Sequence, residues 1–286
     1  MTRREFLILS AAAAAAQEPK PVIAFTCPMD REIRSKGPGK CPRCGMRLAA
    51  DLPVHREYRL ELKTTPAVIR AGTPFDLDLA VRDPDSGAIV RDFEVVHERI
   101  FHLFLIGPRL SYFAHEHPER LPSGGFRYRA NFPEPGAYRI AADCYPKGAT
   151  IQFLARTLIT SDADLDAIGR TPALTAGAGP QQGANLTVEL TTEPAEPVAG
   201  KETILFFDLS PANGLEQYLA AWGHMLVASA DRIDLIHDHP LYADGGPRVQ
   251  FNVIFPRERI YRVWVQFQRQ GVVNTVAFNV PVKALR

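Results

Sequence analysis

The feature that most constrains the fold of this 286-residue chain is an internal repeat marked by histidines. Three histidines and a proline recur with one constant offset along the chain. The matched pairs are His102 and His224, His115 and His237, His117 and His239, and Pro118 and Pro240. The chain holds only 8 histidines, so a chance match of three at one offset is improbable. We therefore predict two copies of one structural unit.

Each copy shows the alternation of apolar and polar residues that is typical of β-strands, nearly perfectly so in Phe75–Arg82. The strands predicted in the first copy are Tyr58–Lys63, Phe75–Arg82, Ile100–Ile106, Leu110–His117, Phe126–Phe132, Ala137–Cys144 and Ile151–Ile159. Those predicted in the second are Leu186–Thr192, Thr203–Leu209, Gly223–Ser229, Arg232–His239, Arg248–Phe255, Ile260–Gln268 and Val272–Val280. Seven strands in about 100 residues are typical of an immunoglobulin-like sandwich. The predicted fold is therefore mainly β, with two tandem immunoglobulin-like β-sandwiches.

Changes in composition predict the domain boundaries. Residues 20–52 are rich in Cys, Met, Pro and Gly, and so short a segment needs a metal or a disulfide to fold. Frequent Gly, Ala, Gln and Pro indicate a linker at 161–184. The predicted segments are an export signal at 1–17, a small zinc-knuckle-like metal module at 20–52, β-sandwiches at 56–160 and 185–286, and the linker at 161–184.

The first residues have the character of an export signal. Arg3 and Arg4 precede a short apolar stretch that begins at Phe6 and ends in a run of alanines at Ala16. A basic head, an apolar middle and a small-residue end are typical of secretory signals, and the arginine pair resembles a twin-arginine signal. We therefore expect a periplasmic or secreted protein, with an ordinary N-terminal helix as the alternative.

The charge and hydropathy of the chain exclude two classes of protein. The formal net charge is +1, from 33 basic and 32 acidic residues, so the basic surface of a nucleic-acid binder is absent. The sequence has no apolar run of the ~18 residues that a transmembrane helix requires. We expect neither nucleic-acid binding nor a permanent membrane span.

Three of the four cysteines lie together in the short N-terminal segment. Cys41 and Cys44 form a Cys-x-x-Cys pair that can hold one ion from a tight turn, and Cys27 can supply a third thiolate. Met29 and Met46 each lie two residues beyond a cysteine. Thiolates with thioethers form a soft ligand set, which favours Cu(I).

This segment resembles the heavy-metal-binding domain family of bacterial metal-efflux adaptors and metal-transporting ATPases. The resemblance rests on Cys27-Pro28-Met29 and on Cys41-Pro42-Arg43-Cys44-Gly45-Met46, about thirty residues in all. Asp30 and Arg31 replace the His and Pro of the family pattern. If that His is a ligand in the family, its loss would make this site softer or weaker. The resemblance implies metal binding beside a metal-efflux or transport partner. A structural zinc knob and a disulfide between Cys41 and Cys44 are the alternatives.

The histidines of the first copy are predicted to converge. His115 and His117 are two residues apart on one strand, so their side chains share a face. A two-residue loop at Pro108-Arg109 would place His102 directly opposite His115, with His117 as the diagonal neighbour. His97 is a further candidate ligand in this copy.

The second copy leads to the same prediction. A two-residue loop at Ala230-Asp231 would place His224 opposite His237, with His239 diagonal. Three neutral imidazoles suit Zn(II), Cu(II) or Ni(II). The alternative is that the histidines are structural and bond to the backbone. The stretches His102–Ile106 and Phe113–Glu119 also resemble periplasmic YtkA-like immunoglobulin-like proteins, which accompany metal-handling genes.

Together these patterns predict an exported, non-enzymatic protein that binds a heavy metal, with copper favoured and zinc the alternative. Its role would be sequestration, delivery or efflux of the metal. The chain has no nucleophile elbow, phosphate loop or His-Glu-x-x-His motif. Glu116 and Asp238 alternate with the histidines and point away from them, which disfavours a metalloenzyme. A protein-interaction scaffold of an efflux system is the second alternative.

Overall fold

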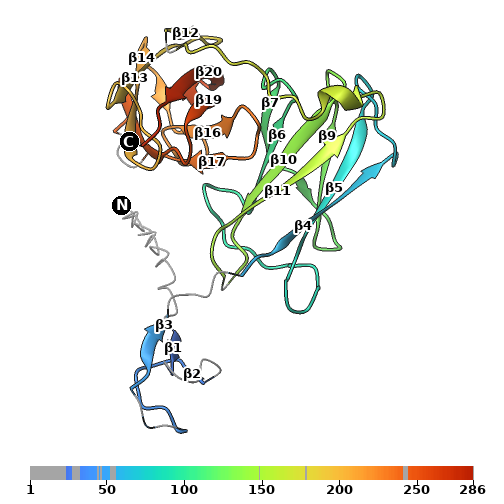
Figure 1. Ribbon diagram of the computed structural model, residues 1–286, viewed down its shortest axis with the longest axis vertical. Coiled ribbons are helices and arrows are strands. Elements are labelled where there is room, and N and C mark those ends of the chain that lie inside the picture. The colour runs from blue at the N-terminus through green and yellow to red at the C-terminus, as the bar shows by residue number, and fades with distance from the viewer. Residues whose placement is uncertain are drawn as a thin grey trace, which may run out of the picture. The chain divides into compact units, whose positions relative to one another are not determined.

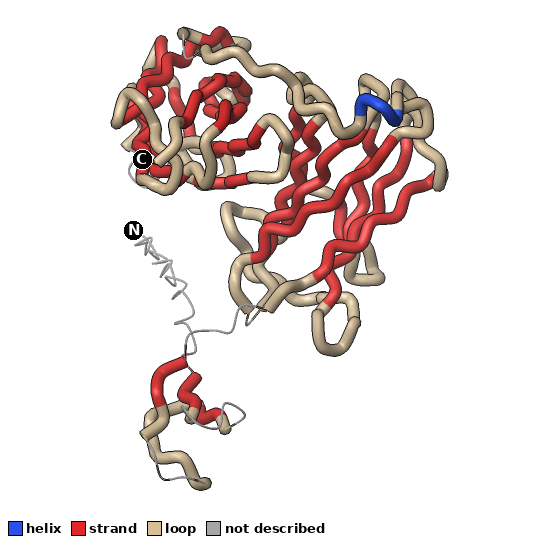
Figure 2. The backbone as a smooth tube through the Cα atoms, in the orientation of Figure 1, coloured by secondary structure: helices blue, strands red, loops and turns tan. Residues whose placement is uncertain are grey.

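The computed structural model divides the chain into two compact units, residues 1–55 and 56–286, which are described separately. It describes residues 24–27, 33–43, 45, 47–51, 56–147, 149–177, 179–240 and 244–285. The predicted export signal lies outside the described residues. Figures 1 and 2 show that strands dominate the described chain, as the sequence predicts. No helix in the described ranges is long and apolar enough to cross a membrane.

The N-terminal unit contains a small antiparallel sheet in the order β2-β1-β3. The strands are β1 (Ala24–Thr26), β2 (Arg34–Ser35) and β3 (Ala49–Asp51). The Leu48 amide donates to the Gly39 carbonyl at 2.9 Å and closes a turn that contains Cys41. Cys27 directly follows β1, so one cysteine lies at the end of the central strand and another lies in the turn.

The first sandwich consists of two sheets, β4-β5-β9-β8 and β11-β10-β6-β7. Its strands are β4 (Arg59–Thr65), β5 (Phe75–Arg82), β6 (Phe101–Ile106), β7 (Phe113–Glu116), β8 (Glu119–Arg120), β9 (Phe126–Ala130), β10 (Ala137–Cys144) and β11 (Gln152–Ile159). Buried and half-buried residues alternate strictly along β5, because one face packs on the core and the other faces solvent. The seven predicted strands are all present.

The second sandwich repeats most of this strand order, with β13-β14-β18 in the place of β4-β5-β9. Its sheets are β12-β13-β14-β18 and β15-β19-β16-β17, with β20 beside β19. The strands are β12 (Gln181–Gln182), β13 (Thr187–Glu193), β14 (Glu202–Ser210), β15 (Leu215–Glu216), β16 (His224–Ser229), β17 (Leu235–Asp238), β18 (Arg248–Ile254), β19 (Arg259–Arg269) and β20 (Val272–Val282). Strands β6, β7, β10 and β11 therefore correspond to β16, β17, β19 and β20. The predicted linker holds a short 3-10 helix, Leu165–Ala167, and its last part includes β12.

Each sandwich contains the tyrosine corner that is typical of immunoglobulin-like folds. The Tyr138 hydroxyl donates to the Glu134 carbonyl at 2.8 Å, and Tyr261 donates to the Arg257 carbonyl at 3.0 Å. Both tyrosine rings are fully buried against a phenylalanine. The two corners fix the bends before β10 and before β19. Each of these central strands carries one residue of the candidate site near its other end.

Strands β6 and β16 are buried along their whole length because both of their faces are covered. Leu103 and Leu105 point into the core of the first sandwich, and the alternate residues point the other way. Those residues join an interface cluster between the two sandwiches. Its buried members are Phe104, Ile106, Leu110, Ala141, Leu226, Ala228 and Trp264.

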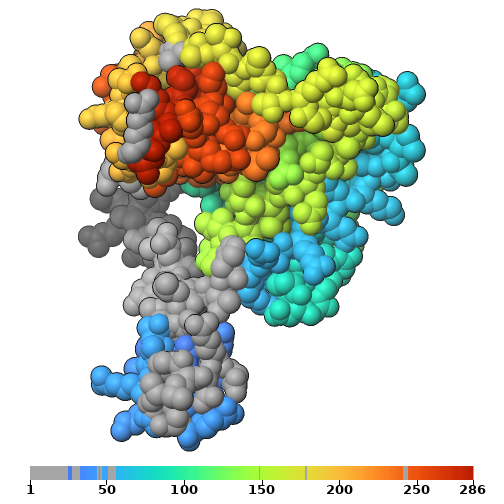
Figure 3. Space-filling view, viewed as in Figure 1, coloured from blue at the N-terminus to red at the C-terminus, as the bar shows by residue number. Residues whose placement is uncertain are grey.

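The interface cluster holds the two sandwiches together through the equivalent sheet of each. Phe113 of β7 stacks on Trp264 of β19, with ring centroids 4.9 Å apart. In Figure 3 the orange and red atoms of the second sandwich abut the yellow-green atoms of the first. His102 and His224 have the same strand parity as the interface residues, so both point toward the opposite sandwich.

The register of the first histidine hairpin differs from the predicted one by two residues. Phe104, rather than His102, is the Cα partner of His115. The Gly107 amide donates to the Tyr112 carbonyl at 2.9 Å, so residues 108–111 form the loop. The predicted two-residue loop is therefore wrong.

The second hairpin departs from prediction in the same way. Leu226, rather than His224, is the partner of His237. The Ser229 amide donates to the Asp234 carbonyl at 2.9 Å, which leaves residues 230–233 in the loop. A shift of two residues keeps each side chain on its predicted face, so the histidines still share one face.

Candidate metal centre

The first histidine triad lies at the end of β6 and β7 that faces the second sandwich. His102 and His115 are 2% and 7% exposed, and His117, just after β7, is half-buried. His102 Nδ1 lies 3.1 Å from His115 Nε2 and 3.2 Å from His117 Nε2. One ring nitrogen from each histidine lies within 4.8 Å of the other two. The structure therefore brings the three predicted residues together.

The second triad has the same arrangement. His224 Nδ1 lies 3.0 Å from His239 Nε2, and the three nitrogens of His224, His237 and His239 also lie within 4.8 Å of one another. The His237 side chain is only 3% exposed. Its Nε2 has no hydrogen-bond partner among the described residues. A buried polar nitrogen without a partner is costly unless a ligand occupies the site.

In each triad, the first histidine along the chain points one ring nitrogen toward the other two histidines. Its second, outer nitrogen bonds to a backbone carbonyl. His102 Nε2 donates to the Val96 carbonyl at 3.0 Å, and His224 Nε2 donates to the Tyr218 carbonyl at 2.8 Å. Each carbonyl belongs to a tight turn whose two central residues have positive φ, at 97–98 and at 219–220. The sequence gives no signal for these turns, because none of the four central residues is Gly or Asn.

The next histidine of each triad is held by the opposite sandwich. His115 Nδ1 lies 2.7 Å from Gln266 Oε1, and His237 Nδ1 lies 2.5 Å from Asp143 Oδ2. Sequence reasoning missed both partners, because alternation shows which face a side chain occupies and not what packs against that face. The signal in the sequence was the repeat itself, which puts Asp143 and Gln266 at corresponding positions of β10 and β19.

These outer contacts fix which ring nitrogens carry protons. A carbonyl or carboxylate oxygen only accepts, so the nitrogen facing it is the protonated one. His102 Nδ1 and His115 Nε2 therefore both present lone pairs, 3.1 Å apart. One proton on His117 can satisfy only one of them. A metal ion accepts all three lone pairs, so the donor set fits a three-histidine metal site.

Burial keeps the imidazoles of His102, His115, His117, His224 and His239 neutral at pH 7, the form that ligates metals. Desolvation lowers the pKa of His102 to about 4 and that of His115 to about 2. It also lowers the pKa of His117 to about 4 and that of His224 to about 3. The pKa of His239 is likewise strongly lowered by burial.

His97 lies against the second triad rather than the first. Its ring stacks on His239 with centroids 3.6 Å apart and meets His224 edge-on at 5.7 Å. The expectation that His97 joins the first triad is therefore wrong, because the turn at 97–98 projects the ring across the interface. A cavity of about 240 Å³ opens beside the second triad and is also lined by His97, by Asp143 and by His102 of the first triad.

The N-terminal unit buries the two described cysteines of the predicted soft-metal site. Cys27 is fully buried, and Cys41 nearly so. The Gly45 amide donates to the Cys41 carbonyl at 2.9 Å, and Gly45 has φ +71°. This is the tight turn expected of a knuckle, where glycine avoids the strain of positive φ. Met29, Cys44 and Met46 lie outside the described residues.

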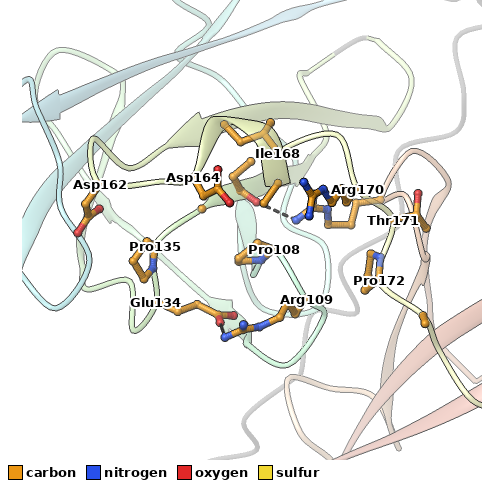
Figure 4. A pocket seen from close by; sticks show the side chains of 15 residues that line it. Pro108, Arg109, Glu134, Pro135, Asp162, Asp164, Ile168, Arg170, Thr171 and Pro172 are labelled. Carbon is orange, nitrogen blue, oxygen red and sulfur yellow. Dashed lines mark hydrogen bonds and ion pairs between the residues drawn. The ribbon is translucent and has the colours of Figure 1, made fainter.

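A further cavity lies away from the predicted histidine ligands. It measures about 760 Å³ and lies between the loops of the first sandwich and the segment that follows β11 (Figure 4). Arg109 and Glu134 form an ion pair at its rim. Its lining contains no histidine or cysteine, so it offers no site for a soft or borderline metal.

Comparison with known families places most of the chain. The model of a domain of unknown function, DUF8832, matches residues 54–159 and again residues 181–284. The chain belongs to this family. The two matches agree with the two-repeat architecture. A second model, described as a heavy metal binding domain, matches residues 24–50, which supports the predicted metal binding but does not identify the metal.

Other comparisons add little. A search of curated proteins found no match. Among solved structures, a chain of the Escherichia coli adhesin FdeC is 13% identical, with a TM-score of 0.25. The similarity covers 84% of this chain and 68% of the adhesin chain.

Proposed function

We propose that this protein is an exported, non-enzymatic binder of heavy-metal ions, with copper favoured, that acts in metal sequestration, delivery or efflux. The observation that carries the proposal is the convergence of three inward-facing imidazole nitrogens in each sandwich. Imidazole triads suit Cu(II), Zn(II) or Ni(II), and the thiolates of the N-terminal unit suit Cu(I). A metal-efflux or metal-transport protein is the proposed partner.

A structural role for the histidines is the competing proposal. The hydrogen bonds from His102 and His224 to backbone carbonyls favour it, because they would hold the strand ends without any metal. In that case metal binding would belong to the N-terminal unit alone. The sandwiches would then serve as an interaction scaffold with a zinc knob.

Elemental analysis separates the two proposals. The full chain would be dialysed against equimolar Cu, Zn and Ni, and the bound metal per chain measured. Two variants share the test: one with Cys27, Cys41 and Cys44 changed to Ser, and one with His117→Ala and His239→Ala. We expect each variant to lose part of the metal and the combined variant to lose it all. Full metal retention after the histidine changes would leave the structural role standing.

A further inference from the structure

In each triad, one histidine donates its outer N–H to a side chain of the other repeat. These two acceptor side chains differ chemically. His115 bonds to Gln266, and His237 bonds to Asp143. Asp143 is the Cα partner of His102, and Gln266 is the Cα partner of His224. The two acceptors therefore occupy one position of the repeat, with a carboxylate in one copy and a carboxamide in the other.

This difference bears on the metal affinity of each triad. An imidazole that donates to a carboxylate is a stronger metal ligand than one that donates to a neutral amide. In a buried site, a negative charge one hydrogen bond from the ligand also offsets the charge of a divalent ion. His237 receives both effects from Asp143, whereas His115 receives neither from Gln266.

Each acceptor directs a side-chain oxygen at its histidine. Gln266 Nε2 donates to Thr275 Oγ1 at 3.0 Å, which turns its oxygen toward His115. Asp143 lies at 2.5 Å from His237 Nδ1. The opposite nitrogen of that same ring is the buried one that lacks a partner among the described residues. The carboxylate thus aims a lone pair into the second triad.

We propose that Asp143 makes the second triad, His224, His237 and His239, the tighter divalent-metal site, and that Gln266 leaves the first triad the weaker one. Asp143 is a positioning residue that acts through His237 from the opposite repeat. The inference rests on the proposed function, since it ranks two sites that the proposed function requires.

The test uses full-length proteins that keep only one triad each. All carry Cys27→Ser, Cys41→Ser and Cys44→Ser to remove the thiolates. His117→Ala leaves only the second triad, and His239→Ala leaves only the first. The two alanines are repeat equivalents, so each protein controls for the other. Zn²⁺ affinity is measured by competition with a chromogenic chelator.

We expect the second triad to bind Zn²⁺ at least about tenfold more tightly than the first. Asp143→Asn keeps the shape of the side chain and an accepting oxygen. It should weaken the second triad by about 10- to 100-fold and the first, in which His102 lies beside Asp143 on the neighbouring strand, by much less. Gln266→Glu, the reciprocal change, should tighten the first triad. A purely structural role of Asp143 would not predict this opposite shift.

Three outcomes separate the inference from the proposed function. Zn²⁺ binding by neither single-triad protein would remove the proposed function of the triads, and the inference with it. Equal affinities of the two triads, unchanged by either Asp143→Asn or Gln266→Glu, would overturn only the inference and not the proposed function. Equal weakening of both triads by Asp143→Asn would also overturn it, because that result indicates no preference of Asp143 for the second triad.

Discussion

At the scale of single residues, the histidines of the two triads are buried and are held in defined orientations. Most buried polar groups complete their hydrogen bonds within the fold. Here the outer nitrogens of His102, His115, His224 and His237 do so, while the inner nitrogens face one another. These acceptors orient the imidazole rings so that the lone pairs of the inner nitrogens point toward a common position.

Burial of these histidines predicts acid sensitivity of the metal-free protein. The pKa of His102 is lowered to about 4 by desolvation, against an ordinary value of 6.5. Between those pH values the unfolded chain takes up a proton that the folded chain does not. Stability is therefore full above pH 6.5 and falls as the pH drops toward 4. For His102 alone the loss is about 3 kcal/mol.

The check is urea unfolding with a metal chelator at pH 7 and at pH 4.5. His102→Gln should lose less stability on acidification than the wild type, because the titrating group is gone. Carboxylates titrate in both proteins and cancel in the comparison. An identical loss in the two proteins would show that His102 does not contribute to acid sensitivity.

At the scale of elements, β6 and β16 are buried along their whole length because each is packed on both faces. Phe104 is 1% exposed, within the interface cluster, and its ring lies 4.5 Å from that of His115. Phe104→Ala should lower the free energy of unfolding by about 3–5 kcal/mol, the cost of a large buried cavity.

Ile254 of β18 is the matched control, since it is an apolar strand residue that is 57% exposed. Ile254→Ala should change stability by no more than about 0.5 kcal/mol. Both values come from urea unfolding at pH 7. Similar losses in the two variants would contradict the two-sided burial of β6.

The strands could be predicted from the sequence because the period of two is strong and the repeat supplies each strand twice. The hairpin loops could not, since neither 108–111 nor 230–233 carries the Asn-Gly or Asp-Gly pair that marks a short hairpin turn. This error did not affect the predicted triads, because a register shift of two residues leaves each side chain on the same face of its strand. Phe101–Ile106 is apolar except for His102, which was a signal of a strand buried on both faces.

At the scale of the whole 56–286 unit, the candidate sites and the interface between sandwiches are one structure. His115 depends on Gln266 of the second sandwich, and His237 depends on Asp143 of the first. The interface cluster is apolar, and its Phe104 ring contacts both His115 and His237. Metal binding and docking of the two sandwiches are therefore expected to be linked.

A single charge in the interface should weaken both sites without altering any ligand. Leu226 is 1% exposed and belongs to the interface cluster rather than to the core of its own sandwich. Leu226→Asp would bury an unpaired carboxylate, which costs several kcal/mol, so the sandwiches should separate while each stays folded. Ile233→Asp is the control, because that side chain is 65% exposed.

Zn²⁺ competition should show weaker binding at both triads in Leu226→Asp only. Unchanged affinity in Leu226→Asp, with Trp264 fluorescence showing that the interface has opened, would disprove the link.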